Sequence, residues 1–148
     1  MPLWKIKPTL DQLNAQSKNT LAEHLGIEFT EIGDDYLKAK MPVDTRTKQP
    51  AGLLHGGASV ALAETLGSVA AYLCIDMAQK SIVGIEINAN HIRPATHGWV
   101  IGMAKPIHVG STTQLWDIRI YNEKNHLVCI SRLTVANLPK PHKLHPEG

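Results

Sequence analysis

The stretch from Ala51 to Ala78, AGLLHGGASVALAETLGSVAAYLCIDMA, decides how this chain folds. It is the most apolar part of the sequence, and its length would admit a membrane span. The carboxylate of Glu64, however, stands at its centre. A carboxylate in the middle of a membrane span costs about 2.5–3.5 kcal/mol even on a lenient insertion scale. The stretch therefore predicts a long helix buried inside a soluble domain.

Shorter elements surround this helix. Thr9 and Thr20 each precede a long acceptor side chain by three positions, which is the spacing of a capping box. This spacing predicts two short helices, and Gly26 predicts the end of the second one. Alternating polar and apolar residues predict a hairpin over 27–41 with its turn at 33–35, and strands over Ser81–Ala89, Trp99–Val109, Gln114–Tyr121 and Leu127–Asn137. Strands interrupted by a single apolar helix favour the α+β class, with a curved antiparallel sheet wrapped around that helix.

The composition limits the kinds of protein this can be. A chain of 148 residues fits one domain, which we expect over 1–138, followed by a disordered tail over 139–148. Fifteen basic and thirteen acidic residues leave a formal charge of +2, so no dense basic face for nucleic acid is expected. Cys74 and Cys129 lie in apolar surroundings and predict free buried thiols. With no leader peptide visible, these thiols indicate a cytoplasmic protein.

The long helix has two different faces on helical spacing. The face predicted to pack inside the sheet consists of Leu62, Leu66, Val69 and Leu73. The opposite face carries small residues around the glutamate: Gly57, Ala61, Ser68 and Ala71. Small side chains let a ligand or a second backbone approach closely, and Ser68 lies one helical turn from Glu64.

Glu64 is a candidate catalytic residue because the helix offers it no partner. No lysine or arginine occurs between Lys48 and Lys80. An unpaired carboxylate at a desolvated position has a raised pKa, which suits a general base or a nucleophile. The alternative is a structural carboxylate paired with a distant basic residue. His55-Gly56-Gly57, just before the helix, favours the catalytic interpretation, because free N–H groups at a helix N-terminus can stabilise an oxyanion.

Four segments together resemble a known family. They are Gln49–Gly57 (QPAGLLHGG), Ala63–Ser68 (AETLGS), Gly84–Pro94 (GIEINANHIRP) and Ser131–Thr134 (SRLT). The chain resembles the hotdog-fold acyl-CoA thioesterases of the phenylacetate-type branch from about residue 3 to residue 138. Within that branch it is most similar to the bacterial thioesterases that act on 1,4-dihydroxy-2-naphthoyl-CoA in menaquinone synthesis and to the proofreading thioesterases of enterobactin synthesis.

The resemblance implies a role for each residue of the motif. The backbone N–H of Gly56 would polarise the thioester carbonyl, and His55 and Gln49 would orient the thioester or the attacking water. Glu64 would act as nucleophile or as general base, and the sequence leaves both roles open. Ser68 would hold the water. The expected product of this chemistry is a free acid and coenzyme A.

The resemblance also implies the binding site and the assembly. Coenzyme A would be bound by Gly84, His91 and Arg93 and by the turn formed by His108, Val109, Gly110 and Ser111. The alternative is that His91 and Arg93 are only the solvated end of a strand. No metal and no cofactor beyond the coenzyme A of the substrate are expected. The active sites would lie at the interface of a homodimer, with Glu64 of one subunit facing Gln49 and His55 of the other, and two dimers would form a tetramer.

Other functions remain open on the sequence. A hotdog protein can bind acyl-CoA without hydrolysing it, but such a protein does not need an unpaired buried carboxylate. Hotdog dehydratases place their histidine in a Pro-Gly-Val context, which the segment 54–57 does not have. The acyl group is also undecided, because Ala51 stands where relatives often carry a bulky aromatic residue. Benzoyl, phenylacetyl and medium-chain groups, and thioesters on a carrier protein, are the alternatives.

Overall fold

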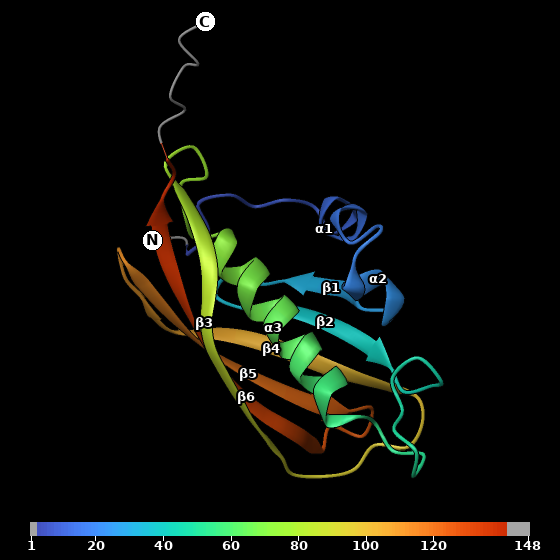
Figure 1. Ribbon diagram of the computed structural model, residues 1–148. Helices are drawn as coiled ribbons and strands as arrows, with labels where there is room; N and C mark the ends of the chain where they lie inside the picture. The colour runs from blue at the N-terminus through green and yellow to red at the C-terminus, as the bar shows by residue number, and fades with distance from the viewer. Residues whose placement is uncertain (1–2, 142–148) are drawn as a thin grey trace, which may run out of the picture.

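The computed structural model describes residues 3–141 and contains a six-stranded antiparallel sheet that curls around one long helix (Figure 1). The central helix is α3 (Gly56–Tyr72), and two short helices, α1 (Leu10–Gln16) and α2 (Leu21–His24), precede the sheet. The strands are β1 (Glu28–Ile32), β2 (Leu37–Pro42), β3 (Lys80–His91), β4 (Trp99–Val109), β5 (Thr113–Asn122) and β6 (Leu127–Pro139). The predicted α+β class with a sheet around one helix is confirmed.

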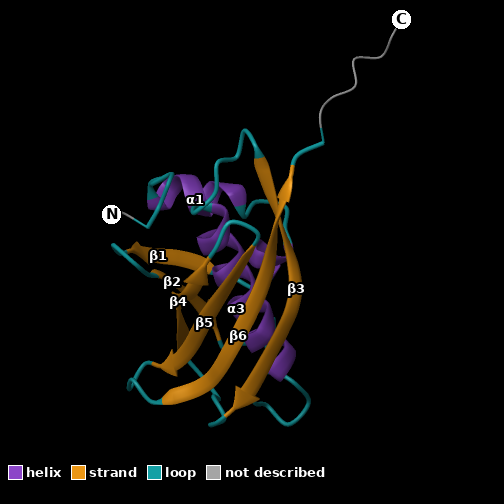
Figure 2. Cartoon of the chain, turned by 90° about the vertical axis from the view of Figure 1, so that its left-hand side faces the viewer, coloured by secondary structure: helices purple, strands orange, loops and turns teal. Residues whose placement is uncertain are grey.

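The strand order is β1-β2-β4-β5-β6-β3, and every neighbouring pair is antiparallel. The strand that follows α3 in sequence, β3, therefore forms one edge of the sheet, and within residues 3–141 it pairs only with β6 (Figure 2). The strand β6 ends at Pro139, which is the first residue of the tail predicted over 139–148. Residues 142–148 of that tail lie outside the described residues.

The sheet covers a wider part of α3 than the predicted stripe. Leu62, Leu66 and Leu73 are buried as predicted. Ala71, which the pattern placed on the open face, is fully buried, whereas Val69 is only partly buried at the edge of the sheet. The reason is curvature: the sheet approaches α3 from several sides, and the small residues of the helix make room for it. No helix of residues 3–141 is long and apolar enough to span a membrane.

Two glycines show how closely the sheet approaches the helix. A Cβ on Gly67 of α3 would lie 2.6 Å from a methyl group of Leu133, and a Cβ on Gly102 of β4 would lie 2.5 Å from a methyl group of Leu66. Neither distance leaves room for a side chain, because interiors are packed as densely as organic crystals. The close packing of α3 against the sheet thus depends on a glycine in the helix and on another in β4.

The N-terminal residues cross the C-terminal end of α3. The N–H groups of Lys5 and Ile6 donate to the Leu73 carbonyl at 2.8 and 3.3 Å. The Trp4 indole donates to the Gly33 carbonyl at 2.7 Å, and its ring stacks on Trp116 with 6.1 Å between centroids. These contacts hold residues 3–16, which we call the N-terminal arm, against the helix and the sheet.

Only one of the two predicted capping boxes is present. Thr9 and Gln12 exchange the two expected hydrogen bonds at the start of α1. Thr20 makes no side-chain cap on α2; its hydroxyl donates instead to the Ser17 carbonyl, because the preceding turn places that carbonyl 2.6 Å away. The predicted stop at Gly26 is confirmed, since this glycine has a φ of +71°.

Candidate active site

The N-terminus of α3 presents free backbone donors as predicted. His55 is the N-cap, and its Nδ1 accepts a hydrogen bond from the Gly57 N–H at 2.7 Å. The Gly56 N–H has no partner among residues 3–141, and it lies at the positive end of the helix dipole. The His91 ring packs directly on this glycine, since a Cβ at position 56 would lie 2.9 Å from Nε2 of His91.

A groove of about 300 Å³ opens beside this helix terminus. Among the residues that line it are Gln49, Gly56, His91 and Arg93. The side-chain carbonyl of Gln49 accepts a hydrogen bond from the Ala51 N–H, which leaves the NH₂ group of the amide available to a ligand. We call this cavity the N-terminal groove. It combines hydrogen-bond donors and a positive charge, which suits an oxygen-rich or anionic group.

Glu64 lies two turns further along α3 and packs against β3. A Cβ on Gly84 would lie only 2.7 Å from Oε1 of Glu64, so the carboxylate rests on the bare backbone of this glycine. The pairing of β3 with β6 shifts register between Gly84 and Glu86, which locally bends the edge strand. Among residues 3–141 Glu64 has no salt bridge, and burial raises the pKa of its carboxyl.

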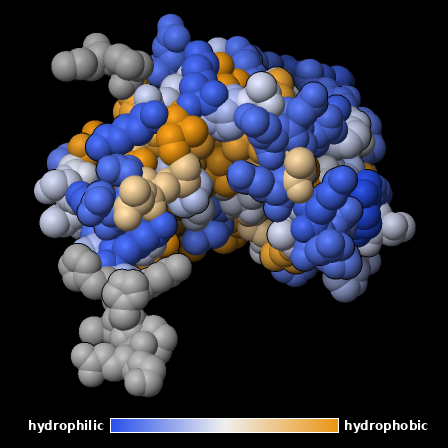
Figure 3. Space-filling model, turned by 90° about the horizontal axis from the view of Figure 1, so that it is seen from above, coloured by the Kyte–Doolittle hydropathy of each residue, from blue (hydrophilic) through white to orange (hydrophobic). Residues whose placement is uncertain are grey.

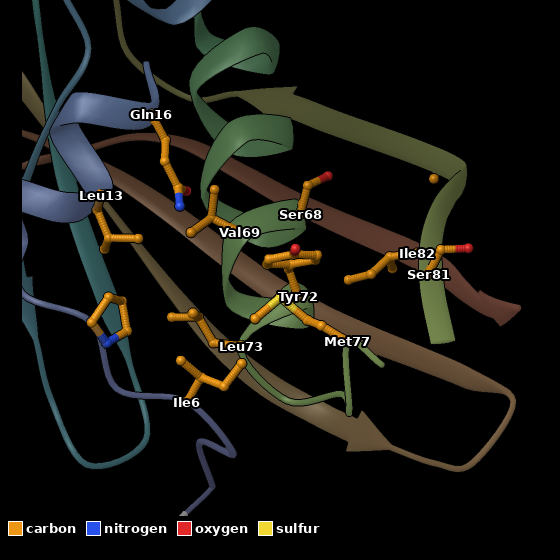
Figure 4. Close-up of a pocket in the computed structure, with 12 residues that line it drawn as sticks. Ile6, Leu13, Gln16, Ser68, Val69, Tyr72, Leu73, Met77, Ser81 and Ile82 are labelled. Carbon is orange, nitrogen blue, oxygen red and sulfur yellow. The ribbon is translucent and has the colours of Figure 1, made fainter. Parts of the chain in front are cut away.

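A second groove, of about 440 Å³, begins next to this carboxylate. It is lined by Ser68 and Gly84 and by mainly apolar side chains from α3, from the start of β3 and from the N-terminal arm (Figure 4). We call it the arm groove. Seen from above, apolar side chains gather in a hollow on this side of the molecule (Figure 3). Such an apolar cleft with a few polar groups is typical of a small-molecule pocket.

One chain does not bring all the predicted catalytic residues together. Gln49 and Gly56 line the N-terminal groove, whereas Ser68 lines the arm groove, next to Glu64. Gly56 and Glu64 are eight residues apart on α3, which is about 12 Å along the helix axis. A reacting carbonyl needs its oxyanion donor and its attacking group each within about 3 Å. The structure therefore places Gly56 and the surroundings of Glu64 in different grooves of one chain.

The predicted coenzyme-binding residues are divided in the same way. His91 is the last residue of β3 and lies with Arg93 in the N-terminal groove. The turn 108–111 lies at the opposite end of β3, where Lys80 Nζ donates to the Ser111 carbonyl at 2.7 Å. Gly84 contacts Glu64 and lines the arm groove, a relation that sequence spacing did not predict. No group of three or more metal-ligating side chains occurs within residues 3–141.

The comparison with known proteins decides the family. Residues 51–129, which include all of α3 and the strands β3, β4 and β5, match the model of the thioesterase superfamily. The chain belongs to this superfamily. The thioesterase is 58% identical to the 1,4-dihydroxy-2-naphthoyl-CoA hydrolase of Escherichia coli K12, with 92% of this chain and 99% of that protein covered. It is 56% identical to the proofreading thioesterase EntH of Cronobacter turicensis, over 90% of this chain and 97% of the relative.

Solved structures agree with this assignment. A mutant of the Pseudomonas aeruginosa thioesterase PA1618 superimposes with a TM-score of 0.92 at 52% identity, over 93% of this chain and 99% of that one. The Haemophilus influenzae thioesterase HI1161 also superimposes with a TM-score of 0.92. It is 49% identical, with 97% of this chain and 99% of that chain covered. The predicted hotdog fold and the predicted class of thioester hydrolase are both confirmed.

Proposed function

We propose that this thioesterase hydrolyses aryl-CoA thioesters, and that 1,4-dihydroxy-2-naphthoyl-CoA of menaquinone synthesis is its principal substrate. The observation that carries the chemistry is the partly buried, unpaired carboxylate of Glu64 at the edge of an apolar groove. The identity of 58% along almost the whole length of the E. coli hydrolase supports the choice of acyl group. The arm groove is apolar enough to hold an aromatic ring.

Glu64 has two chemically complete roles. As general base it takes a proton from water, whose oxygen bonds to the thioester carbon; the C–S bond then breaks and the thiolate of coenzyme A takes up the proton. As nucleophile its oxygen bonds to that carbon, coenzyme A leaves, and water hydrolyses the resulting anhydride. Both routes consume one water and yield the same acid and thiol. A raised pKa makes the Glu64 carboxylate a stronger base in the first route and a stronger nucleophile in the second.

The other residues of the site stabilise and orient the reacting groups. The Gly56 N–H at the positive end of α3 would bind the carbonyl oxygen as negative charge develops on it. The Gln49 amide and His55 would orient the thioester or the water. The hydroxyl of Ser68, one helical turn after Glu64, would hold the water close to the carboxylate.

These roles require two chains, and the edge strand supports such a dimer. The strand β3 is long and open on one side, with Val83 exposed by 48% and Ile85 by 61%. An apolar, unpaired edge strand favours pairing with a second strand. Antiparallel pairing of two β3 strands centred between Ile87 and Asn88 would place Gly84, and with it Glu64, opposite the partner's His91, whose ring packs on Gly56. The two halves of the site would then meet, twice in each dimer.

The same pairing would complete the coenzyme site. His91 and Arg93 at one end of β3 would come close to the partner's turn of His108, Val109, Gly110 and Ser111. Arginine and histidine would pair with the phosphates of coenzyme A, and the turn would offer backbone and hydroxyl donors. We further propose that two such dimers form a tetramer, as the family resemblance implies.

A spacing in a relative supports the catalytic pair. Two mutant structures of a Staphylococcus aureus thioesterase are described, one with a glutamine and one with a glutamate replaced by alanine. These two residues are fifteen positions apart in that protein, as Gln49 and Glu64 are here. The relative covers 81% of this chain with a TM-score of 0.78 at 42% identity.

A second candidate function is proofreading of aryl groups on a carrier protein. The identity of 56% to the Cronobacter proofreading enzyme favours this function. That identity is only slightly lower than the 58% to the E. coli hydrolase, which favours hydrolysis of naphthoyl-CoA. The chemistry of Glu64 would be the same, and only the carrier of the thioester would differ.

The test is thiol release from 1,4-dihydroxy-2-naphthoyl-CoA, benzoyl-CoA and a matching aryl group on a carrier protein. We expect the naphthoyl-CoA to give the highest kcat/KM, and Glu64→Gln to lower it by about 10²-fold or more. A preference for the carrier-bound substrate would favour proofreading. Saturable binding without thiol release from any substrate would refute hydrolysis and indicate an acyl-CoA-binding protein.

A further inference from the structure

The N-terminal arm forms one wall of the arm groove. Ile6, Pro8, Leu13 and Gln16 line the cavity opposite Val69 and Tyr72 of α3 (Figure 4). The backbone hydrogen bonds of Lys5 and Ile6 to Leu73 hold this wall in place. The wall is thus built from residues that precede the sheet in sequence.

The groove and the carboxylate share one boundary. Gly84, whose backbone carries the Glu64 carboxylate, and Ser68, one turn beyond Glu64, both line the arm groove. An acyl group whose carbonyl carbon lies at Glu64 can thus extend along α3 toward the arm. A two-carbon acetyl group would fill only a small part of this groove, whereas an aromatic acyl group would extend further along it.

Gln16 gives the wall a polar end. It is the last residue of α1, and its amide is directed into the groove toward Val69 (Figure 4). Its side chain makes no hydrogen bond within residues 3–141, as the bonds of α1 to its surroundings run through Thr9, Gln12 and Asn14. An amide can both donate and accept, so it can bind a hydroxyl group on an aromatic ring.

We propose that the N-terminal arm selects the acyl group of the substrate, with Ile6 contacting the aromatic ring and Gln16 hydrogen-bonding a hydroxyl substituent on it. This inference rests on the proposed thioesterase site at Glu64. The substrate class that it names is a hydroxylated aryl thioester, because the wall combines apolar contacts with one amide. Ile6 and Gln16 are specificity-determining residues in this scheme, and neither takes part in the chemical step.

The experiment compares kcat/KM for acetyl-CoA, benzoyl-CoA and 4-hydroxybenzoyl-CoA in three variants. Ile6→Ala should lower the value for both aromatic substrates about tenfold and leave acetyl-CoA unchanged, because lost methylene contacts weaken binding only where they are made. Gln16→Leu should lower the ratio of hydroxybenzoyl to benzoyl hydrolysis about fivefold through the lost hydrogen bond. Leu21→Ala, at a side chain on α2 that is 63% exposed, is the control and should change no ratio.

Each contrary result has a separate meaning. Parallel loss on all three substrates in Ile6→Ala, or unchanged ratios in both arm variants, would refute selection by the arm while leaving the thioesterase site intact. Absence of thiol release by the unaltered protein would refute the proposed function, and the inference with it. Because Gln16 is exposed, its variant should fold even if Ile6→Ala lowers the melting temperature.

Discussion

At the scale of single residues, Glu64 links stability to activity through its pKa. Burial raises the pKa of the folded carboxyl above its ordinary value, so the folded protein holds this proton more tightly than the unfolded chain. Ionisation of Glu64 therefore lowers the free energy of unfolding. The full loss is present at pH values above the pKa of the folded protein, and there is no loss at pH values below the ordinary pKa of the unfolded chain.

We predict that Glu64→Gln increases the free energy of unfolding at pH 7 relative to the unaltered protein, and by less at pH 4. Urea unfolding at the two pH values measures this difference. An equal effect at both pH values would show that the carboxylate is not desolvated. The same variant should lower kcat/KM for thioester hydrolysis by about 10²-fold or more, so that activity falls while stability rises.

Gly84 offers a second test at this scale. Its missing side chain leaves the space that Glu64 Oε1 occupies, so a Cβ there must displace the carboxylate. We predict that Gly84→Ala lowers kcat by about 10²-fold, because small displacements of a catalytic group are costly. The same substitution in a Glu64→Asp background should have little further effect, since the shorter side chain vacates that space.

The control for the Gly84→Ala variant is Gly102→Ala. There a Cβ would meet a Leu66 methyl group at 2.5 Å, so the steric conflict is similar but lies in the core. We expect this variant to lower the melting temperature and to keep kcat. An equal loss of kcat in both glycine variants would mean that Gly84 acts only through the stability of the fold.

At the scale of elements, the two threonines at the starts of α1 and α2 share the spacing of a capping box, but only Thr9 makes the capping hydrogen bond. Thr9→Ala removes a capping hydrogen bond and should lower the free energy of unfolding by about 1 kcal/mol. Thr20→Ala should cost less than half of that, because Thr20 makes no cap on α2. Equilibrium unfolding of the two variants in urea measures the difference, and similar losses would contradict it.

The elements themselves follow largely from local pattern. The alternation of Trp116, Ile118 and Ile120 with polar residues predicted β5, and all three side chains are fully buried. The stripe on α3 was predicted less well, because a periodicity identifies an apolar face but not how far a curved sheet wraps around it. For this reason Val69, predicted to be buried, is only partly buried, and Ala71, predicted on the open face, is fully buried.

At the scale of the whole molecule, we expect activity to depend on a second chain that pairs with the open edge of β3. If Glu64 of one subunit acts with Gly56 and Gln49 of the other, a mixture of two inactive variants should recover activity. We predict that Gln49→Ala and Glu64→Gln, unfolded together and refolded in equal amounts, regain roughly a quarter of the unaltered activity, since half of the dimers hold one intact site. Failure to regain activity would place the whole site in one chain.

Disruption of the edge gives a complementary prediction. Ile85→Lys adds a charge to the unpaired strand, and charges on an edge strand oppose pairing. Light scattering should then report a single chain, with thioester hydrolysis lost although the melting curve remains cooperative. A dimer that persists in this variant would exclude β3 as its interface.

The sequence by itself determined the elements and the fold class, and it predicted the residues of the candidate catalytic motif. It could do so because strand alternation, helical spacing and the glycines before α3 act between near neighbours in the chain. The tertiary structure decided which of these residues meet. It set Glu64 on Gly84 near the middle of β3, Gly56 against His91 at the end of that strand, and the arm beside Tyr72. Such contacts depend on strand order and sheet curvature, which arise only when distant segments pack together.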